Sequence, residues 1–198
     1  MKRPIWIILI TLLLDQALKV WVKTHMYLGQ EYQLLDWFYI HFTENNGMAF
    51  GMEFGGDWGK LTLSLFRIVF VAFIASYLIK LIRKNADKIL ITSLSLILAG
   101  AIGNILDGAF YGLLFSESYH QLASFLPEGG GYAPLFFGRV VDMFYFPMFK
   151  GYLPEWIPFW GGDYFVFFRP VFNIADAAIS IGVGIMILFQ KRVMKELE

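Results

Sequence analysis

The chain has 198 residues, of which 58% are hydrophobic, 19% aromatic and 16% charged, and its formal net charge is zero. An ordinary soluble domain is roughly 45–50% apolar, so this composition excludes a disordered chain. Zero net charge provides no basic field for nucleic acid, and we expect no nucleic-acid partner. The chain contains no cysteine, which excludes disulfides, thiolate nucleophiles and cysteine-ligated metals. The length predicts a single domain over residues 1–198.

Four stretches are apolar and long enough to cross a bilayer core, which requires about 20 helical residues. They are residues 5–22, 61–82, 89–107 and 171–189. These stretches predict a membrane all-α bundle of four transmembrane helices. A cleaved signal peptide is the alternative for the first stretch, but that run is long, contains Asp15 and Lys19, and lacks an Ala-x-Ala-like exit.

The distribution of Lys and Arg predicts how the bundle is oriented. Nine of these residues lie in the short segments 1–4, 80–88 and 190–198, whereas only five lie in the long connections 23–60 and 108–170. Because cytoplasmic loops carry the excess of positive charge, we expect both termini in the cytoplasm and both long connections outside.

The outer connections have a composition of their own. Residues 27–54 contain aromatic and β-branched clusters punctuated by Gly, which predicts short strands forming a small extracytoplasmic β element. Residues 127–134 are rich in Gly and Pro and predict a flexible loop. The aromatic residues at 144–146, Trp156 and 159–160 are typical of interfacial anchors, with a binding role as the alternative for some of them.

Carboxylates from four separate segments are expected at a similar depth near the outer surface. They are Asp15, Asp107, Asp142 and Asp176. Three of them have a polar neighbour at a spacing that places both side chains on one helix face. These neighbours are Lys19 for Asp15, Asn104 for Asp107 and Asn173 for Asp176. For the Asp15 and Asp107 groups the alternative is a structural ion pair or an interhelical clamp, whereas Asp142 and Asp176 are the candidate acid and base.

Two carboxylates facing one water are sufficient for peptide hydrolysis. The ionised one takes a proton from the attacking water, and the protonated one hydrogen-bonds the carbonyl oxygen and later protonates the amine. Like charges a few ångströms apart cannot both ionise easily, so such a pair divides these roles. None of the three His lies in a His-Glu-x-x-His arrangement, and no Gly-x-Ser-x-Gly occurs. We therefore expect neither a metal nor a cofactor.

Two other classes of function stay open at this point. A small transporter or proton channel also uses intramembrane Asp and Lys, but it needs ionisable groups at several depths, and the inner halves of the third and fourth stretches have none. A non-catalytic assembly factor would use the polar residues for helix packing alone. It does not explain why Asp142, outside the apolar stretches, should join the same layer.

Five motifs, in order along the chain, carry a resemblance to a known family. They are Asp15-Gln16-Ala17-Leu18-Lys19, Asn45-Asn46-Gly47-Met48-Ala49-Phe50, Gly103-Asn104-Ile105-Leu106-Asp107, Val140-Val141-Asp142 and Phe172-Asn173-Ile174-Ala175-Asp176. Together they resemble the motifs of the lipoprotein signal peptidases (signal peptidase II), which are aspartic proteases of the bacterial inner membrane.

The resemblance implies that Asp142 and Asp176 are the catalytic pair. It implies a further set that shapes the site and holds the substrate: Asp15, Lys19, Asn45, Asn104, Asp107, Asn173 and Ala175. We expect Gly47, Val140 and Arg139 to belong to the same site. The implied substrate is a diacylglyceryl-modified prolipoprotein, cut on the amino side of its lipidated cysteine near the outer face of the membrane. Membrane lipid is then the other partner, and we expect a monomer.

The chain departs from the family pattern at two places. The family often has Arg directly after the aspartate of the third motif, where this chain has Gly108. We therefore expect another charge partner for Asp107, with Arg139 as first candidate and Arg169 as second. Residues 109–138 also form a longer connection than is usual in the family.

Overall fold

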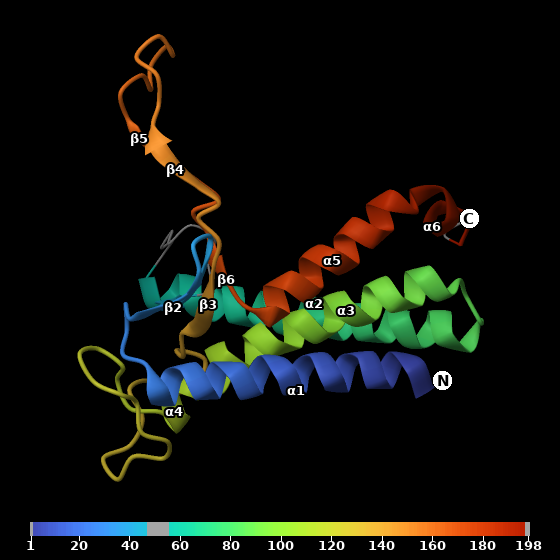
Figure 1. Ribbon diagram of the computed structural model, residues 1–198. Coiled ribbons are helices and arrows are strands. Elements are labelled where there is room, and N and C mark those ends of the chain that lie inside the picture. The colour runs from blue at the N-terminus through green and yellow to red at the C-terminus, as the bar shows by residue number, and fades with distance from the viewer. Residues whose placement is uncertain (1, 47–55, 197–198) are drawn as a thin grey trace.

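The computed structural model describes residues 2–46 and 56–196. Its main body is a group of apolar helices: α1 (Lys2–His25), α2 (Gly56–Arg83), α3 (Lys88–Leu106) and α5 (Ile174–Leu188), with the short α6 (Gln190–Lys195) after α5. Helix α3 packs against each of α1, α2 and α5 and forms the centre of the bundle (Figure 1). Helix α1 begins and α6 ends at the same end of the bundle, opposite the sheet (Figure 1).

Three helical segments of the described chain are long and apolar enough to cross a membrane. They are Lys2–His25, Trp58–Arg83 and Lys88–Leu114, and they contain the first three predicted stretches. Helix α5 is apolar but has only 15 residues, fewer than the roughly 20 that a bilayer core requires. The prediction of long apolar helices is therefore confirmed for three segments, and the fourth is shorter than predicted.

Two predicted boundaries are wrong for local reasons. The third stretch does not end at Asp107, because a π-helical turn, η2 (Asp107–Tyr111), and α4 (Gly112–Leu114) continue it. The fourth stretch does not begin at residue 171, because β6 (Val171–Phe172) precedes α5. The side chain of Asn173 caps α5, so the helix can begin only at Ile174.

Much of the apolar surface of the helices faces outward. Leu13 of α1 is 70% exposed and Val69 of α2 is 68% exposed, whereas α3 is the most buried of the three long helices. A soluble protein rarely exposes large contiguous apolar patches, but helices in lipid can present them to the acyl chains. The outward-facing Leu, Ile, Val and Phe side chains therefore fit a surface covered by lipid.

Helices α3 and α5 pack closely because small residues lie between them. A Cβ on Gly100 would lie 2.2 Å from the backbone oxygen of Ala175, and one on Gly182 would lie 2.7 Å from that of Ser93. Small residues at such crossings let two backbones approach, as is usual for helices packed within a membrane. This close approach fixes the start of α5 against α3.

A four-stranded antiparallel sheet lies at one end of the bundle. Its strands are β1 (Glu31–Leu35), β2 (Phe38–Asn45), β3 (Val140–Tyr145) and β6, in the order β1-β2-β3-β6. The small sheet expected within residues 27–54 is confirmed by β1 and β2, but β3 and β6 come from the second long connection. The pairing of β2 with β3 places Thr43 opposite Asp142 and Asn45 opposite Val140.

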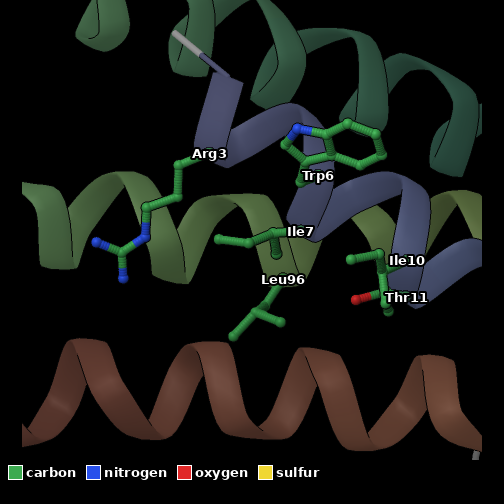
Figure 2. Close-up of a pocket in the computed structure, with 6 residues that line it drawn as sticks. All are labelled: Arg3, Trp6, Ile7, Ile10, Thr11 and Leu96. Atoms are coloured by element: carbon green, nitrogen blue, oxygen red, sulfur yellow. The ribbon is translucent and has the colours of Figure 1, made fainter.

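Two further features complete the fold. Strands β4 (Phe149–Tyr152) and β5 (Tyr164–Phe167) form a separate hairpin that extends from the sheet, crosswise to the helices (Figure 1). Helices α1 and α5 meet near the sheet and diverge toward the end that holds the termini (Figure 1). In that half of the bundle, a mostly apolar crevice of about 610 Å³ is lined by one face of α1 and by Leu96 of α3 (Figure 2). Its α1 residues are Arg3, Trp6, Ile7, Ile10 and Thr11.

Candidate active site

Asp142 and Asp176 are joined by the residue that caps α5. Asn173 accepts a hydrogen bond from the backbone N–H of Asp176 (2.9 Å), and its own N–H donates to Asp176 Oδ2 (3.3 Å), which completes a capping box. The side-chain nitrogen of Asn173 also donates to Asp142 Oδ1, at 2.6 Å. One asparagine therefore fixes a carboxylate on β3 relative to one on the first turn of α5.

Two more asparagines surround the pair. Asn45, at the end of β2, donates to Asp142 Oδ2. Asn104, on α3, donates to Asp176 Oδ1 (2.8 Å), and its oxygen accepts a hydrogen bond from Asn173 (3.2 Å). Each aspartate thus accepts hydrogen bonds at both of its oxygens, Asp142 from Asn45 and Asn173, and Asp176 from Asn104 and Asn173.

A buried ion network around Lys19 contacts one of these asparagines, Asn104. The Lys19 ammonium is 2.9 Å from Asp15 Oδ2 and 2.8 Å from Asp107 Oδ2, and none of the three side chains is more than 1% exposed. The same ammonium donates to Asn104 Oδ1 at 3.0 Å. Buried charges are tolerated when they are paired and hydrogen-bonded, and this network ties α1 to α3 next to the carboxylate pair.

Small residues allow α1, α3 and α5 to meet around Asp15. The backbone N–H of Ala175 donates to Asp15 Oδ1 at 2.9 Å, and Ala175 is fully buried. A Cβ on Gly103 would lie 2.8 Å from Asp15 Oδ2, so a larger residue there would displace the carboxylate. Both positions therefore require small side chains for steric reasons.

The two carboxylates differ in their surroundings. Asp142 is 2% exposed, whereas Asp176 is only partly buried. Burial raises the pKa of Asp142 to about 8, and the negative charge of Asp176 adds to this rise. Burial therefore favours the protonated form of Asp142, which lies next to a second carboxyl group that solvent can reach.

The prediction that Arg139 is the charge partner of Asp107 is wrong. Asp107 pairs with Lys19, whereas Arg139 binds Glu44 (2.8 Å) and Glu117 (2.7 Å). Arg139 lowers the pKa of the Glu117 carboxyl through this contact. The reason is geometric, because Arg139 precedes β3, where the antiparallel neighbour β2 places Glu44 beside it.

The second candidate, Arg169, contacts only the backbone oxygen of Tyr164, at 3.4 Å, among the described hydrogen bonds. The first candidate, Arg139, instead joins a second ion cluster, in which the buried Lys23 binds Glu44 and donates to Ser118 at 2.9 Å. This cluster ties the long connection 109–138 to α1 and β2. It contacts the pair indirectly, since Glu44 directly precedes Asn45.

Val140 and Gly47 are the two remaining predicted site residues. Val140 is buried on β3, opposite Asn45, and its position in the strand helps to set the register of Asp142. Gly47 lies outside the described residues. The structure therefore brings together Asp15, Lys19, Asn45, Asn104, Asp107, Asp142, Asn173, Ala175 and Asp176, and it places Arg139 in the neighbouring cluster.

Two residues near the site were not singled out by sequence. Gln16 donates to Asp107 Oδ1 (2.9 Å) and accepts from Tyr111 (3.2 Å), and its place directly after Asp15 in the first motif was the available signal. Arg67 of α2 lines a narrow cavity with Asn104 and lies within electrostatic range of Asp176. An arginine in an apolar stretch was the signal for this second residue.

The arrangement has the groups needed for acid–base hydrolysis. A buried carboxyl group and a more exposed one are held beside each other by amide donors, and the ion network around Lys19 fixes those donors. Among the described residues, no group of three or more His, Cys, Asp or Glu side chains has the geometry to hold a metal ion.

Comparison with known proteins decides the family. Residues 7–191 match the family model described as Signal peptidase (SPase) II. The chain belongs to the signal peptidase II family. A lipoprotein signal peptidase of Porphyromonas gingivalis is 54% identical over 187 residues, which cover 94% of this chain and 81% of that protein. One of Amoebophilus asiaticus is 39% identical over 198 residues, covering 95% of this chain and 79% of that protein.

A solved structure is similar in fold. It is described as a bacterial membrane enzyme, and it matches with a TM-score of 0.62 and 23% identity, over 99% of this chain and 92% of its own. At this identity the likeness concerns the fold alone. Membership in the signal peptidase II family makes the chain a protease, and its apolar helices make it a bacterial membrane protein. The transporter and assembly-factor alternatives are set aside on this ground.

Proposed function

We propose that the chain is an intramembrane aspartic endopeptidase. It removes the signal peptide from diacylglyceryl-modified prolipoproteins by cleaving on the amino side of the lipidated cysteine. The relatives named lipoprotein signal peptidase support the substrate class. The chemistry rests on the buried Asp142 and partly exposed Asp176, both hydrogen-bonded to Asn173.

In this mechanism Asp176 is the general base and Asp142 the general acid. Asp176 is the more exposed of the two and lies at the N-terminus of α5, where backbone N–H groups and the helix dipole favour a negative charge. It takes a proton from the water that attacks the scissile carbonyl. Asp142 hydrogen-bonds the oxyanion that develops on the carbonyl oxygen and then gives its proton to the departing amine as the C–N bond breaks. The proton that Asp176 took from water then passes to Asp142, which restores the pair.

The asparagines and the ion network position these groups. Asn45 and Asn173 hold Asp142, and Asn104 holds Asp176. The Lys19 ammonium donates to Asn104 and holds this side chain in place. The two aspartates therefore do not have to reorganise during the reaction. No metal or cofactor takes part in this scheme, and all of its residues come from one chain, which suits a monomer.

The proposed topology follows from charge and length. Positive residues cluster where α1 begins, between α2 and α3, and after α5, so this end of the bundle is cytoplasmic and the sheet lies at the outer face. Helix α5 alone is short for a bilayer core, but α5 and α6 together extend from Ile174 to Lys195 and so cross the membrane. The pair then lies at the outer surface of the inner membrane, where the lipidated cysteine of a prolipoprotein is held by its acyl chains.

The test is cleavage of a purified diacylglyceryl-modified prolipoprotein, with a chelator in the buffer. Asp142→Asn and Asp176→Asn should each lower kcat by at least about a hundredfold, as expected for removal of an acid–base group. Asp36→Asn, an exposed carboxylate at the tip of the β1–β2 hairpin, is the matched control and should retain full activity. Melting of each variant is followed alongside.

Two outcomes would contradict the assignment. Either folded variant could cleave at the rate of the control, which would exclude that carboxylate from the chemistry. The wild-type enzyme could leave the lipidated substrate intact while cutting the unlipidated form, which would exclude the proposed substrate class.

A further inference from the structure

Residues 147–170, here called the aromatic arm, leave the sheet after β3 and return to it at β6. Nine of their 24 residues are Phe, Tyr or Trp, about twice the frequency in the whole chain. The arm contains β4 and β5, which form a two-stranded sheet apart from the other strands of the described chain. Nothing in the mechanism proposed above uses it.

The aromatic side chains of the arm are not covered by the rest of the described chain. Phe159 is 97% exposed, Trp156 80% and Tyr152 77%. A two-stranded hairpin by itself is marginal in water, because it has no hydrophobic face to bury. The arm therefore needs a partner surface that accepts many aromatic rings.

The position of the arm favours a lipid surface as this partner. At its root, Phe168 lies edge-on to Phe172 (5.9 Å between ring centroids), and Phe146 packs on the same ring (5.5 Å). Phe172 is two residues before α5, so the root lies at the end of the apolar helices. From there the arm extends crosswise to the helix axes, and thus along the plane of a membrane that these helices cross (Figure 1).

The charge of the arm indicates what kind of attraction holds it. It carries Lys150 and Arg169 against Glu155 and Asp163, so its formal charge is zero. The Lys150 ammonium lies over the ring of Tyr39, 4.9 Å from its centroid, and is directed back toward the sheet. Trp and Tyr rings favour the headgroup region regardless of lipid charge, so this composition fits partition into the interface rather than attraction to anionic lipid.

We propose that the aromatic arm is a membrane anchor that lies in the outer interface, with its rings inserted among the headgroups. Strand β3 carries Asp142 and leads directly into the arm, so the anchor sets the height of the sheet above the bilayer. The side of the membrane follows from the topology proposed above, but contact with lipid does not depend on the peptidase activity.

The absence of native cysteine allows a direct test on the full chain. A nitroxide label is placed at Phe159→Cys in enzyme reconstituted into phosphatidylcholine vesicles, with and without phosphatidylglycerol. Its collision rates with oxygen and with a water-soluble nickel chelate then report depth. Leu13→Cys, on the outward face of α1, is the lipid reference, and Glu128→Cys, on an exposed loop, is the water reference.

The expected ratio of oxygen to chelate collisions at Phe159→Cys is several-fold above that of Glu128→Cys, and equal in the two lipid compositions and at high salt. A ratio equal to that of Glu128→Cys would overturn the proposal. Dipolar broadening between labels would also overturn it, because the arm would then pair with a second copy. Trp156→Cys repeats the measurement, and melting identifies a variant that fails to fold, so the result does not rest on one substitution.

Discussion

Replacement of Lys19 by Met tests whether the ion network supports the fold as its geometry implies. The Lys19 ammonium is fully buried and lies within 3.0 Å of Asp15, Asp107 and Asn104. Methionine fills a similar volume but leaves two buried carboxylates facing each other without a cation. Loss of one partner from a buried ion pair costs about 3–5 kcal/mol. For a chain of this length, that free energy corresponds to a decrease in Tm of about 6–20 °C.

The assay is thermal unfolding of the purified enzyme in detergent, with Lys80→Met as the matched control. Lys80 is exposed in the last turn of α2, so the control should melt close to the wild type. The double variant Lys19→Met/Asp107→Asn removes one of the two unpaired charges and should recover part of the loss. The reasoning is refuted if Lys19→Met melts like Lys80→Met, or if the losses of Lys19→Met and Asp107→Asn simply add, because additive losses mean that the two charges do not interact.

Three further predictions concern the pair, the second ion cluster and the helix crossing. Because the pKa of Asp142 is raised to about 8, the acid form is present below that pH and is lost above it. Therefore kcat should fall about tenfold per unit as pH rises beyond this value, and a rate that stays constant well above it would exclude Asp142 as the acid. Arg139→Ala should cost about 1.5–3 kcal/mol in unfolding free energy, because it removes hydrogen bonds from two glutamates. It should also lower turnover more than Arg169→Ala does, and equal melting and turnover in the two variants would contradict this. Gly103→Ala should lower the free energy of unfolding by about 1–3 kcal/mol through overpacking. Gly184→Ala, with open space around its Cβ, should stabilise α5 slightly, and the same Tm change in both variants would contradict the steric argument.

The sequence predicted the parts of the fold that hydropathy controls. The first three apolar stretches lie within α1, α2 and the segment formed by α3, η2 and α4, because about 20 apolar residues have few alternatives to a membrane helix. The boundaries near the site were less predictable. A capping asparagine starts α5 three residues late, and a π-helical turn carries the third helix past Asp107. The start of α5 depends on a side-chain hydrogen bond, and neither boundary is contained in an average over hydropathy.

For the site, the sequence predicted which residues come together better than it predicted their partners. The motifs identified the residues that the structure brings together, since spacings of three and four on a helix already place polar side chains on one face. They did not identify the partner of Asp107. Lys19 comes from α1, and the distance of 2.8 Å between them exists only because α1 and α3 cross there. Arg139 lies close to Asp142 in the sequence, but the pairing of β2 with β3 directs it to Glu44.

By itself, the sequence determined that this chain is an apolar bundle with a layer of carboxylates near one end, and its motifs pointed to the family. Both properties are local, since they depend on runs and spacings within single helices or loops. The tertiary structure decided which oxygen accepts from which amide, which of the two carboxyl groups is the more deeply buried, and how the aromatic arm lies relative to the helices. These properties depend on contacts between segments far apart in the chain, such as Asp15 with Ala175 and Asn45 with Asp142. Packing fixes such contacts to within an ångström, whereas a sequence pattern fixes only which face of an element a residue occupies.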